Sequence, residues 1–356
     1  MLSFNMVSSC IVIPVLNEHD NLKRMLQVFH SDTHLILVDD GSTDGVEEIA
    51  STYPNVILIE RGRRSGLVSD IMDGMKEALK GGADYIVTMD GDGQHDPLYI
   101  DDILEFTKGE GADLVIGSRY VKGGGTQGFS PPRREVSRVA NYFYRISFDG
   151  GISDATSGFR VYSRRAAEYL VKNPPSRGSY AGQVEIVNDL FRAGMKVKEF
   201  PITLRRRISG ESKLSRADIW DFFIYTLVNG NLWKYIAVGA SGAIINELFL
   251  FLLAPRIWFP VADIIAIEVS ITTNFMFNER WTFWRRKLDR SLGRTVTRFY
   301  LHNASSVLGL SVNFIVFIGL ALLGSNLLLA NLVGIIIAFS IRYLMSSQVI
   351  WVDGHR

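Results

Sequence analysis

Two carboxylates one residue apart, Asp90 and Asp92, carry the clearest chemical signal in this chain of 356 residues. They follow a short apolar run, Tyr85 to Met89, and the glycines around them let the backbone turn sharply. The pattern is typical of a buried strand that delivers acidic side chains to the ligand-binding edge of an α/β sheet. The two acids can share a hard divalent cation, and Gln94 can supply a third oxygen. This set fits Mg²⁺ or Mn²⁺ held partly by substrate phosphates.

The segments that must position these acids alternate between strand and helix. Apolar runs of strand length lie at 10–14, 35–38, 56–59 and 85–89, separated by segments of helical character that end near residues 30, 53 and 80. Further strands are expected at 114–118 and 196–201, and further helices at 130–148 and 183–193. This alternation predicts a mostly parallel sheet with right-handed crossovers and a nucleotide cleft at one edge.

Several function classes are disfavoured by what the sequence lacks. No Gly-x-Gly-x-x-Gly follows the first strand and no Gly-x-x-x-x-Gly-Lys-Ser/Thr occurs, which argues against dinucleotide dehydrogenases and P-loop NTPases. The balance of 38 basic and 37 acidic residues creates no field that would select nucleic acid. A single cysteine, Cys10, provides no disulfide framework, and no signal peptide is recognised at the start, so we expect the N-terminal part in the cytoplasm.

The last third differs from the rest in hydropathy. Apolar runs at 232–254, 257–277, 300–323 and 327–349 each approach the ~20 residues that a membrane-spanning helix needs, which predicts four spans. Before them, Ile219, Phe222, Phe223 and Leu227 fall on helical spacing and predict an amphipathic juxtamembrane helix. The expected organisation is a catalytic domain over 1–214, the juxtamembrane helix over 215–230, and an all-α transmembrane domain over 231–356.

Charged residues in this last third set the expected orientation. Basic residues gather between the second and third runs, at Arg280, Arg285, Arg286, Lys287, Arg290, Arg294 and Arg298. The positive-inside rule places them, the catalytic domain and both termini of a multi-pass protein on the cytoplasmic side of the cell membrane. Glu268 and Arg342 are costly inside spans, so we expect them to pair across the second and fourth spans.

The ordered motifs at 11–18, 38–44 and 89–95 resemble those of inverting family-two glycosyltransferases with the GT-A fold. The stretch 207–214 narrows the resemblance to polyprenol-phosphate glycosyltransferases, a group that includes the dolichol-phosphate mannose synthases. The chain departs from the family pattern at Gly66-Leu67-Val68, where a third glycine is usual, which puts close backbone approach at Val68 in doubt. The segment 274–283, with Tyr235 and Arg342, resembles the GtrA-like four-helix membrane family, which is assigned to anchoring or lipid-glycan translocation.

The resemblance implies roles for individual residues. Metal binding falls to Asp90, Asp92 and Gln94, and catalysis to Asp90, Asp92, Arg119 and Arg133. The nucleotide would be bound by Pro14, Val15, Glu18, Asp39, Asp40, Asp90 and Gly91. The acceptor phosphate would be bound by Arg119, Arg133 and Ser137, and the position of Arg207 and Lys213 just before the membrane favours phosphate binding for them too. Arg63 and Arg64 either touch the donor diphosphate or are solvated loop charges.

The expected activity is transfer of a sugar from a nucleotide sugar to a dolichyl or polyprenyl phosphate with inversion. GDP-mannose is the favoured donor, giving dolichyl β-D-mannosyl phosphate. UDP-glucose remains an alternative donor, and a lipid-glycan translocation component remains an alternative function. The helix expected over 130–148 begins with Arg133, Arg134 and Arg138 and has an aromatic-rich face. Such a helix suits a lipid headgroup surface, or else it packs on the sheet like any other.

Overall fold

The computed structural model describes residues 9–149, 151–207, 215–286 and 288–352, apart from the side chain of Arg133. The chain divides into two compact units. The first comprises Met1–Arg145 and Gly150–Thr226, and the second comprises Ile146–Asp149 and Leu227–Arg356. Each unit is built around its own set of packed elements.

A seven-stranded sheet forms the centre of the first unit, in the order β3-β2-β1-β4-β7-β5-β8. Neighbouring strands are parallel except β7, which runs antiparallel to β4 and β5. The predicted mostly parallel α/β fold is therefore confirmed. The strands are β1 (Ser9–Val15), β2 (Leu35–Asp39), β3 (Val56–Glu60), β4 (Tyr85–Thr88), β5 (Leu114–Ser118), β7 (Arg160–Ser163) and β8 (Val197–Pro201), and the short β6 (Gly125–Thr126) pairs separately with β9 (Thr203–Leu204).

Helices cover both faces of this sheet because the strands are apolar on both sides. Ile11 and Ile13 of β1 belong to a core that also contains buried residues of α1, α2 and α4, whereas Val12 faces the other way and packs against Gly74 of α3. The covering helices are α1 (His19–Leu26), α2 (Val46–Ala50), α3 (Leu67–Lys80), α4 (Tyr99–Glu110), α6 (Arg164–Lys172) and α7 (Tyr180–Arg192). The result is a three-layer α/β/α arrangement.

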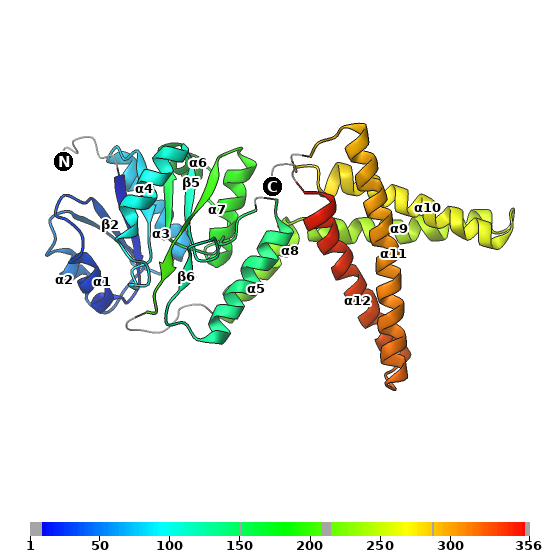
Figure 1. Ribbon diagram of the computed structural model, residues 1–356. Helices are drawn as coiled ribbons and strands as arrows, with labels where there is room; N and C mark the ends of the chain where they lie inside the picture. The colour runs from blue at the N-terminus through cyan, green and yellow to red at the C-terminus, as the bar shows by residue number, and fades with distance from the viewer. Residues whose placement is uncertain (1–8, 150, 208–214, 287, 353–356) are drawn as a thin grey trace. The chain divides into compact units, whose positions relative to one another are not determined.

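Two further helices, α5 (Pro131–Ser147) and α8 (Arg216–Asn229), lie side by side (Figure 1). Phe143 of α5 and Phe223 of α8 contact each other with ring centroids 5.3 Å apart. Both helices also leave apolar side chains exposed, including Val139 on α5 and Trp220 and Ile224 on α8. The expected helices at 130–148 and 215–230 are thus present, and their outer surfaces are suited to an apolar environment.

Within its described residues, the second unit contains four helices long and apolar enough to cross a membrane, as predicted. Figure 1 shows α9 (Leu232–Leu253) lying along α10 (Phe259–Phe277) and α11 (Leu292–Leu322) along α12 (Leu327–Met345). The helix α11 begins at Leu292, earlier than the expected Tyr300, so Arg294 and Arg298 are helical and not part of a loop. The early start is stabilised by Arg298, which is buried and bonded to Glu279.

The predicted ion pair between Glu268 and Arg342 is wrong for the described residues. Glu268 is exposed on α10, and Arg342 donates from Nη2 to the hydroxyl of Ser306 on α11 at 2.9 Å. The reason is the pairing of the helices. Because α12 packs along α11, Arg342 lies against Gly309 of α11 and not against α10.

Instead, a buried polar cluster forms beside two π-helical turns, η1 (Asn278–Thr282) and η2 (Ser346–Ile350). Arg298 donates to both carboxylate oxygens of Glu279, at 3.0 and 2.6 Å, and the indole of Trp351 donates to the same carboxylate at 2.7 Å. Arg286 donates to Asp149 at 2.7 Å and to the carbonyl of Ser347 at 2.5 Å. The charges in this cluster are therefore paired and hydrogen-bonded, as burial requires.

Candidate functional site

The site forms where β1, β2 and β4 end at one edge of the sheet, because parallel strands present their carboxyl ends together. Two pockets open there, a larger one of about 480 Å³ and a smaller one of about 380 Å³. Asp90, which follows β4, lines both of them. The two pockets therefore share the carboxylate of Asp90 at their boundary, together with Tyr180 and Asp218.

The larger pocket gathers most of the residues expected at a nucleotide site. Its lining includes Pro14, Val15, Glu18, Asp40, Asp90, Gly91, Asp92 and Arg207. Gly91 has to be a glycine, since a Cβ there would lie 2.9 Å from the side chain of Val15 and 3.2 Å from the carbonyl oxygen of Pro14. The ends of β1 and β4 thus approach closely enough to form one wall.

The smaller pocket combines charged and apolar side chains. Its polar groups include those of Asp90, Asp218, Gln94, His95, Arg119, Arg134 and Ser137, and Phe129, Val136, Ile219, Phe222 and Phe223 supply much of its apolar lining. Tyr120 donates its hydroxyl hydrogen to Ser137 at 2.8 Å, which fixes the serine at the pocket wall. A cationic end beside an apolar end suits an amphipathic molecule with a phosphate group.

Asp90 occupies a tight position between these pockets. A Cβ on Gly158 would lie 2.8 Å from its Oδ1, so a side chain at residue 158 would displace the carboxylate from its position. The backbone amide of Asp90 donates to Nδ1 of His95 at 3.0 Å, which holds the turn after β4. Loss of solvation, opposed by His95 and reinforced by the charge of Asp92, raises the pKa of Asp90 above its usual value.

Asp92 is turned toward the larger pocket, where it meets Arg207. Nη2 of Arg207 lies 2.5 Å from Oδ2 of Asp92, and Nη1 lies 3.7 Å from Glu18. Asp92 is also held locally, because it accepts from the backbone amide of Gln94 at 3.0 Å. Desolvation favours the neutral form of Arg207, but the carboxylates of Asp92 and Glu18 outweigh it and raise the pKa of Arg207. Arg207 therefore faces the acidic side of the site.

These residues fit a divalent cation of the magnesium type. In the part of the chain that the structure describes, no group of three or more His, Cys, Asp or Glu side chains is arranged to hold a metal ion. Mg²⁺ in phosphate-transfer sites commonly takes one or two carboxylates and completes its shell with water and substrate phosphates. Asp90 and Asp92 would supply the carboxylates, and both line the larger pocket. Gln94 lines the smaller pocket, and its amide nitrogen donates to the carbonyl of Arg205 at 2.8 Å.

Arg119 is held rigidly at the smaller pocket by Asp154. Its Nε and Nη2 each donate to the fully buried carboxylate of Asp154 at 2.6 Å, and Nη2 also donates to Thr156 at 2.9 Å. Burial alone would favour the neutral form, but the charge of Asp154 outweighs it and raises the pKa of Arg119. The structure gives no partner to Nη1 among the residues it describes, so this nitrogen can donate to a ligand.

Asp39 and Asp40 are occupied by the loops that follow them. Asp39 accepts from the amide of Ser42 at 3.0 and 3.2 Å and from its hydroxyl, and it does not line the larger pocket. Asp40 does line it, but its two oxygens accept from the amides of Ser65 at 2.5 Å and Gly66 at 3.1 Å. Both acids therefore fix the main chain around the pocket.

Two predicted acceptor ligands cannot be placed. Lys213 lies outside the described residues, and so does the side chain of Arg133. Val68, where the family usually has glycine, is 2% exposed, contacts Gly182 of α7 and is not among the residues that line the larger pocket.

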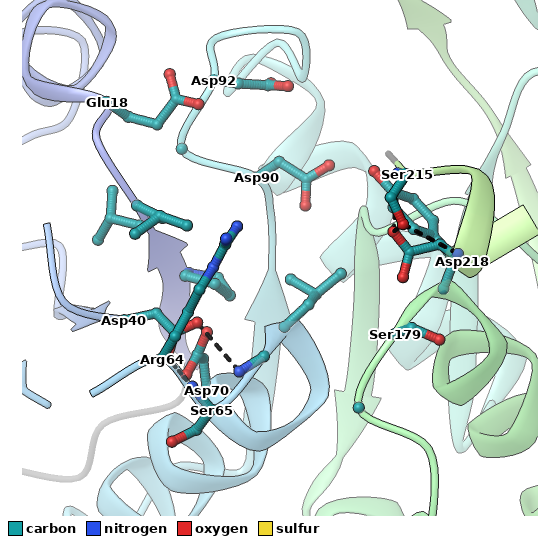
Figure 2. A pocket seen from close by; sticks show the side chains of 18 of the residues that line it. Glu18, Asp40, Arg64, Ser65, Asp70, Asp90, Asp92, Ser179, Ser215 and Asp218 are labelled. Atoms are coloured by element: carbon teal, nitrogen blue, oxygen red, sulfur yellow. Dashed lines mark hydrogen bonds between the residues drawn. The ribbon is translucent and has the colours of Figure 1, made fainter. Parts of the chain in front are cut away.

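For Arg64, the sequence left open a contact with the donor diphosphate or a solvated loop charge. Figure 2 shows Arg64 extending from its loop into the larger pocket toward Asp90, which favours a ligand role for this arginine.

Several other lining residues were not predicted from the sequence. Arg134 lines the smaller pocket beside Ser137, and the remaining unpredicted lining residues include Ser65, Asp70, Tyr120, Ser179, Tyr180 and Asp218. Arg134 follows Arg133 in a helix with a basic start, which was the available signal. Tyr180 and Asp218 lie far away in the sequence and carried none.

Comparison with known proteins gives a consistent result. Residues 10–171 match the family Glycosyl transferase family 2, and residues 234–351 match the family GtrA/DPMS, transmembrane domain. A protein of Pyrococcus furiosus named dolichol-phosphate mannosyltransferase is 34% identical over 363 residues, covering 96% of this chain and 98% of that protein. A protein of Mycolicibacterium smegmatis named polyprenol monophosphomannose synthase is 34% identical over 217 residues, covering 59% of this chain and 82% of that protein.

Solved structures align less closely. Glucosyl-3-phosphoglycerate synthase from Mycobacterium tuberculosis aligns with a TM-score of 0.47 and 20% identity, covering 64% of this chain and 81% of that one. The TarS protein of S. aureus aligns with a TM-score of 0.43 and 13% identity, covering 98% of this chain and 93% of that one. The sequence relatives carry the family assignment.

Proposed function

The chain belongs to glycosyltransferase family 2, among the dolichol-phosphate mannosyltransferases that carry a GtrA/DPMS transmembrane domain, and on this premise we propose that it transfers mannose from GDP-mannose to a dolichyl or polyprenyl phosphate. The anomeric carbon is inverted and the product is dolichyl β-D-mannosyl phosphate. The names of the pyrococcal and mycobacterial relatives support the sugar and the lipid class. The observation that carries the proposal is the position of Asp90 on both pockets.

The larger pocket takes the nucleotide sugar. Glu18 is buried at its wall and accepts from ribose hydroxyls, while Arg64 reaches into the middle of the pocket toward the diphosphate. Asp90, Asp92 and Gln94 would hold Mg²⁺ or Mn²⁺, which supplies neutralising charge to the leaving diphosphate. The sugar then lies at the boundary with the smaller pocket.

The smaller pocket takes the acceptor. Its phosphate is already an anion near neutral pH, so the attacking oxygen needs no general base. Nη1 of Arg119, the hydroxyl of Ser137 and the guanidinium of Arg134 hold this phosphate, and by resemblance to the family Arg133, Arg207 and Lys213 would add positive charge. Because Arg119 is fixed by Asp154, it can position the nucleophile without reorganising.

Direct displacement follows from this placement. The acceptor oxygen approaches the anomeric carbon from the smaller pocket while the diphosphate departs into the larger one. A single displacement inverts the carbon, so an α-linked nucleotide sugar becomes a β-linked lipid phosphate sugar. The role of the protein is positioning and charge compensation.

Apolar surfaces on the catalytic unit support its location at the membrane. Phe129, Ile219 and Phe223 extend the smaller pocket beyond its phosphate-binding end and can take the first isoprene units. The exposed apolar residues of α5 and α8 suit a position at the bilayer surface. With the positive-inside rule, we place the catalytic domain and both termini in the cytoplasm.

The test is a donor comparison in isolated membranes. Radiolabelled GDP-mannose and UDP-glucose are each incubated with membranes containing the protein and added polyprenyl phosphate, and lipids are then extracted. We expect label in the lipid fraction from GDP-mannose only, and none with Asp92→Ala. Label from UDP-glucose would move the assignment to a glucosyltransferase, and label from neither donor would favour a translocation component.

A further inference from the structure

Asp70 is a buried acid that the proposed reaction does not yet use. It lies in the first turns of α3, is only 2% exposed, and lines the larger pocket. Figure 2 shows Asp70 beside Asp40 at one end of this pocket, with Asp90 and Asp92 toward the other. Asp70 therefore lies at the end of the donor site away from the two metal-binding carboxylates.

The carboxylate of Asp70 has no hydrogen-bond donor among the described residues, and its Oδ1 is buried without one. The nearest cation is Arg61, whose Nη1 lies 3.5 Å from Oδ1. Arg61 is not dedicated to it, because its Nη2 donates to Asp73 and to the carbonyl of Ser69. Buried carboxylates are normally hydrogen-bonded, so this one lacks the donors that its position calls for.

The neighbouring acids Asp39 and Asp40, by contrast, have hydrogen-bond donors. Asp39 is satisfied by Ser42, and both oxygens of Asp40 accept main-chain amides. Among these three acids at the end of β2 and the start of α3, Asp70 alone keeps its acceptor positions for a ligand. Burial, with the negative charge of Asp40 next in importance, also raises the pKa of Asp70 from 3.8 to about 7. A ligand with hydrogen-bond donors would relieve this cost.

We propose, resting on the assignment of the larger pocket to the nucleotide sugar, that Asp70 reads the nucleobase and selects guanine over uracil. The N1–H and N2–H groups of guanine lie side by side and match the two oxygens of one carboxylate. Uracil presents a single N3–H between two carbonyl oxygens, which a carboxylate repels. Asp70 is thus a specificity-determining residue for GDP over UDP.

The test compares Asp70→Asn with Asp73→Asn in the full-length protein in detergent. Asp73 shares Arg61 and lies one turn further along α3, but it does not line the pocket, so it is a matched control. Dissociation constants for GDP and UDP are measured by calorimetry with Mg²⁺. We expect Asp70→Asn to weaken GDP binding by about 10- to 100-fold while UDP binding changes by less than about threefold. Asp73→Asn should leave both constants close to wild type.

Equal losses for GDP and UDP in Asp70→Asn, or no loss of GDP binding, would overturn the inference. The conservative variant Asp70→Glu, which keeps the charge, separates base reading from folding, because it should retain the preference for GDP even if both affinities fall. The wild-type constants test the donor assignment separately. A wild type that prefers UDP contradicts GDP-mannose as donor, whereas a wild type that prefers GDP with an unaltered Asp70→Asn contradicts only the role of Asp70.

Discussion

Arg207 lies against Asp92, with Nη2 and Oδ2 2.5 Å apart, although the two residues are far apart in the sequence. Asp92 is the expected ligand of a divalent cation and Arg207 the expected ligand of a phosphate. Their pairing means that the guanidinium and the metal ion compete for one carboxylate.

Arg207→Gln should therefore tighten binding of Mn²⁺ to the nucleotide-free protein. Removing a competing cation from Asp92 and Glu18 is expected to lower the dissociation constant by about tenfold. Electron paramagnetic resonance of free Mn²⁺ measures this directly. Arg205→Gln is the control, since Arg205 pairs with Asp96 outside both pockets. An unchanged or weaker affinity in Arg207→Gln would show that the pair does not compete with the metal.

Asp92→Ala should abolish most transfer. Loss of a group that stabilises charge on the leaving diphosphate is expected to lower kcat by about 10²–10³-fold or more. The rate of mannosyl transfer into lipid is the measurement, with Asp96→Asn as a control in the same loop. Activity of Asp92→Ala within a few fold of wild type would remove Asp92 from the metal site.

Arg134→Ala should raise the KM for polyprenyl phosphate several-fold and leave the KM for the donor nearly unchanged. The reason is that Arg134 lines only the smaller pocket. The same result is expected for Arg133→Ala. Arg138→Ala is the matched control, because Arg138 pairs with Glu135 on the same helix, 2.9 Å away. Equal effects on both substrates would take these arginines out of the acceptor site.

The Glu279–Arg298 pair should dominate the stability of the second unit. Glu279→Gln or Arg298→Met leaves a buried charge without its partner, and each is expected to cost about 3–5 kcal/mol. The double variant should lose less than the sum, as measured by thermal unfolding in detergent. Arg294→Met, on the same helix but largely exposed and 4.0 Å from Asp289, should change stability by less than about 0.5 kcal/mol. Additive losses would contradict the coupling.

Asp70 should make the free energy of unfolding of the nucleotide-free protein fall as the pH rises. Its pKa is raised from 3.8 to about 7 by burial and by Asp40, with Asp73 and Asp39 adding to the rise and Arg61 opposing it. The folded state thus binds a proton that the unfolded chain has lost, so this contribution is present below pH 4 and disappears as the pH rises through 7. The Tm of Asp70→Asn should therefore rise relative to the Tm of wild type as the pH goes from 5 to 8. A difference independent of pH would show that Asp70 titrates normally.

Much of the fold was predictable because its signals are local. Apolar runs of strand length, alternating with helical segments, indicate a parallel sheet, and four long apolar runs indicate four spans. The boundary of α11 was misjudged because Arg298 looks like a loop charge until Glu279 is known to face it. The Glu268–Arg342 pairing was wrong because sequence does not show which spans lie side by side.

Several residues of the site could also be predicted from the sequence. Asp90, Asp92 and Glu18 follow strand ends, and the structure places all three on the larger pocket. Asp70 was missed because an acid in the first turn of a helix normally needs no explanation beyond the helix dipole. Its burial and its missing donors depend on Arg61 and Asp40, which only the folded chain brings near it.

The stereochemistry of the product is the most direct test of an acceptor phosphate and a leaving diphosphate that meet across Asp90. Purified protein is incubated with GDP-α-mannose labelled with ¹³C at the anomeric carbon and a short polyprenyl phosphate, and the lipid product is examined by NMR. A single displacement between the two pockets predicts a β-linked mannosyl phosphate. An α-linked product would contradict this account.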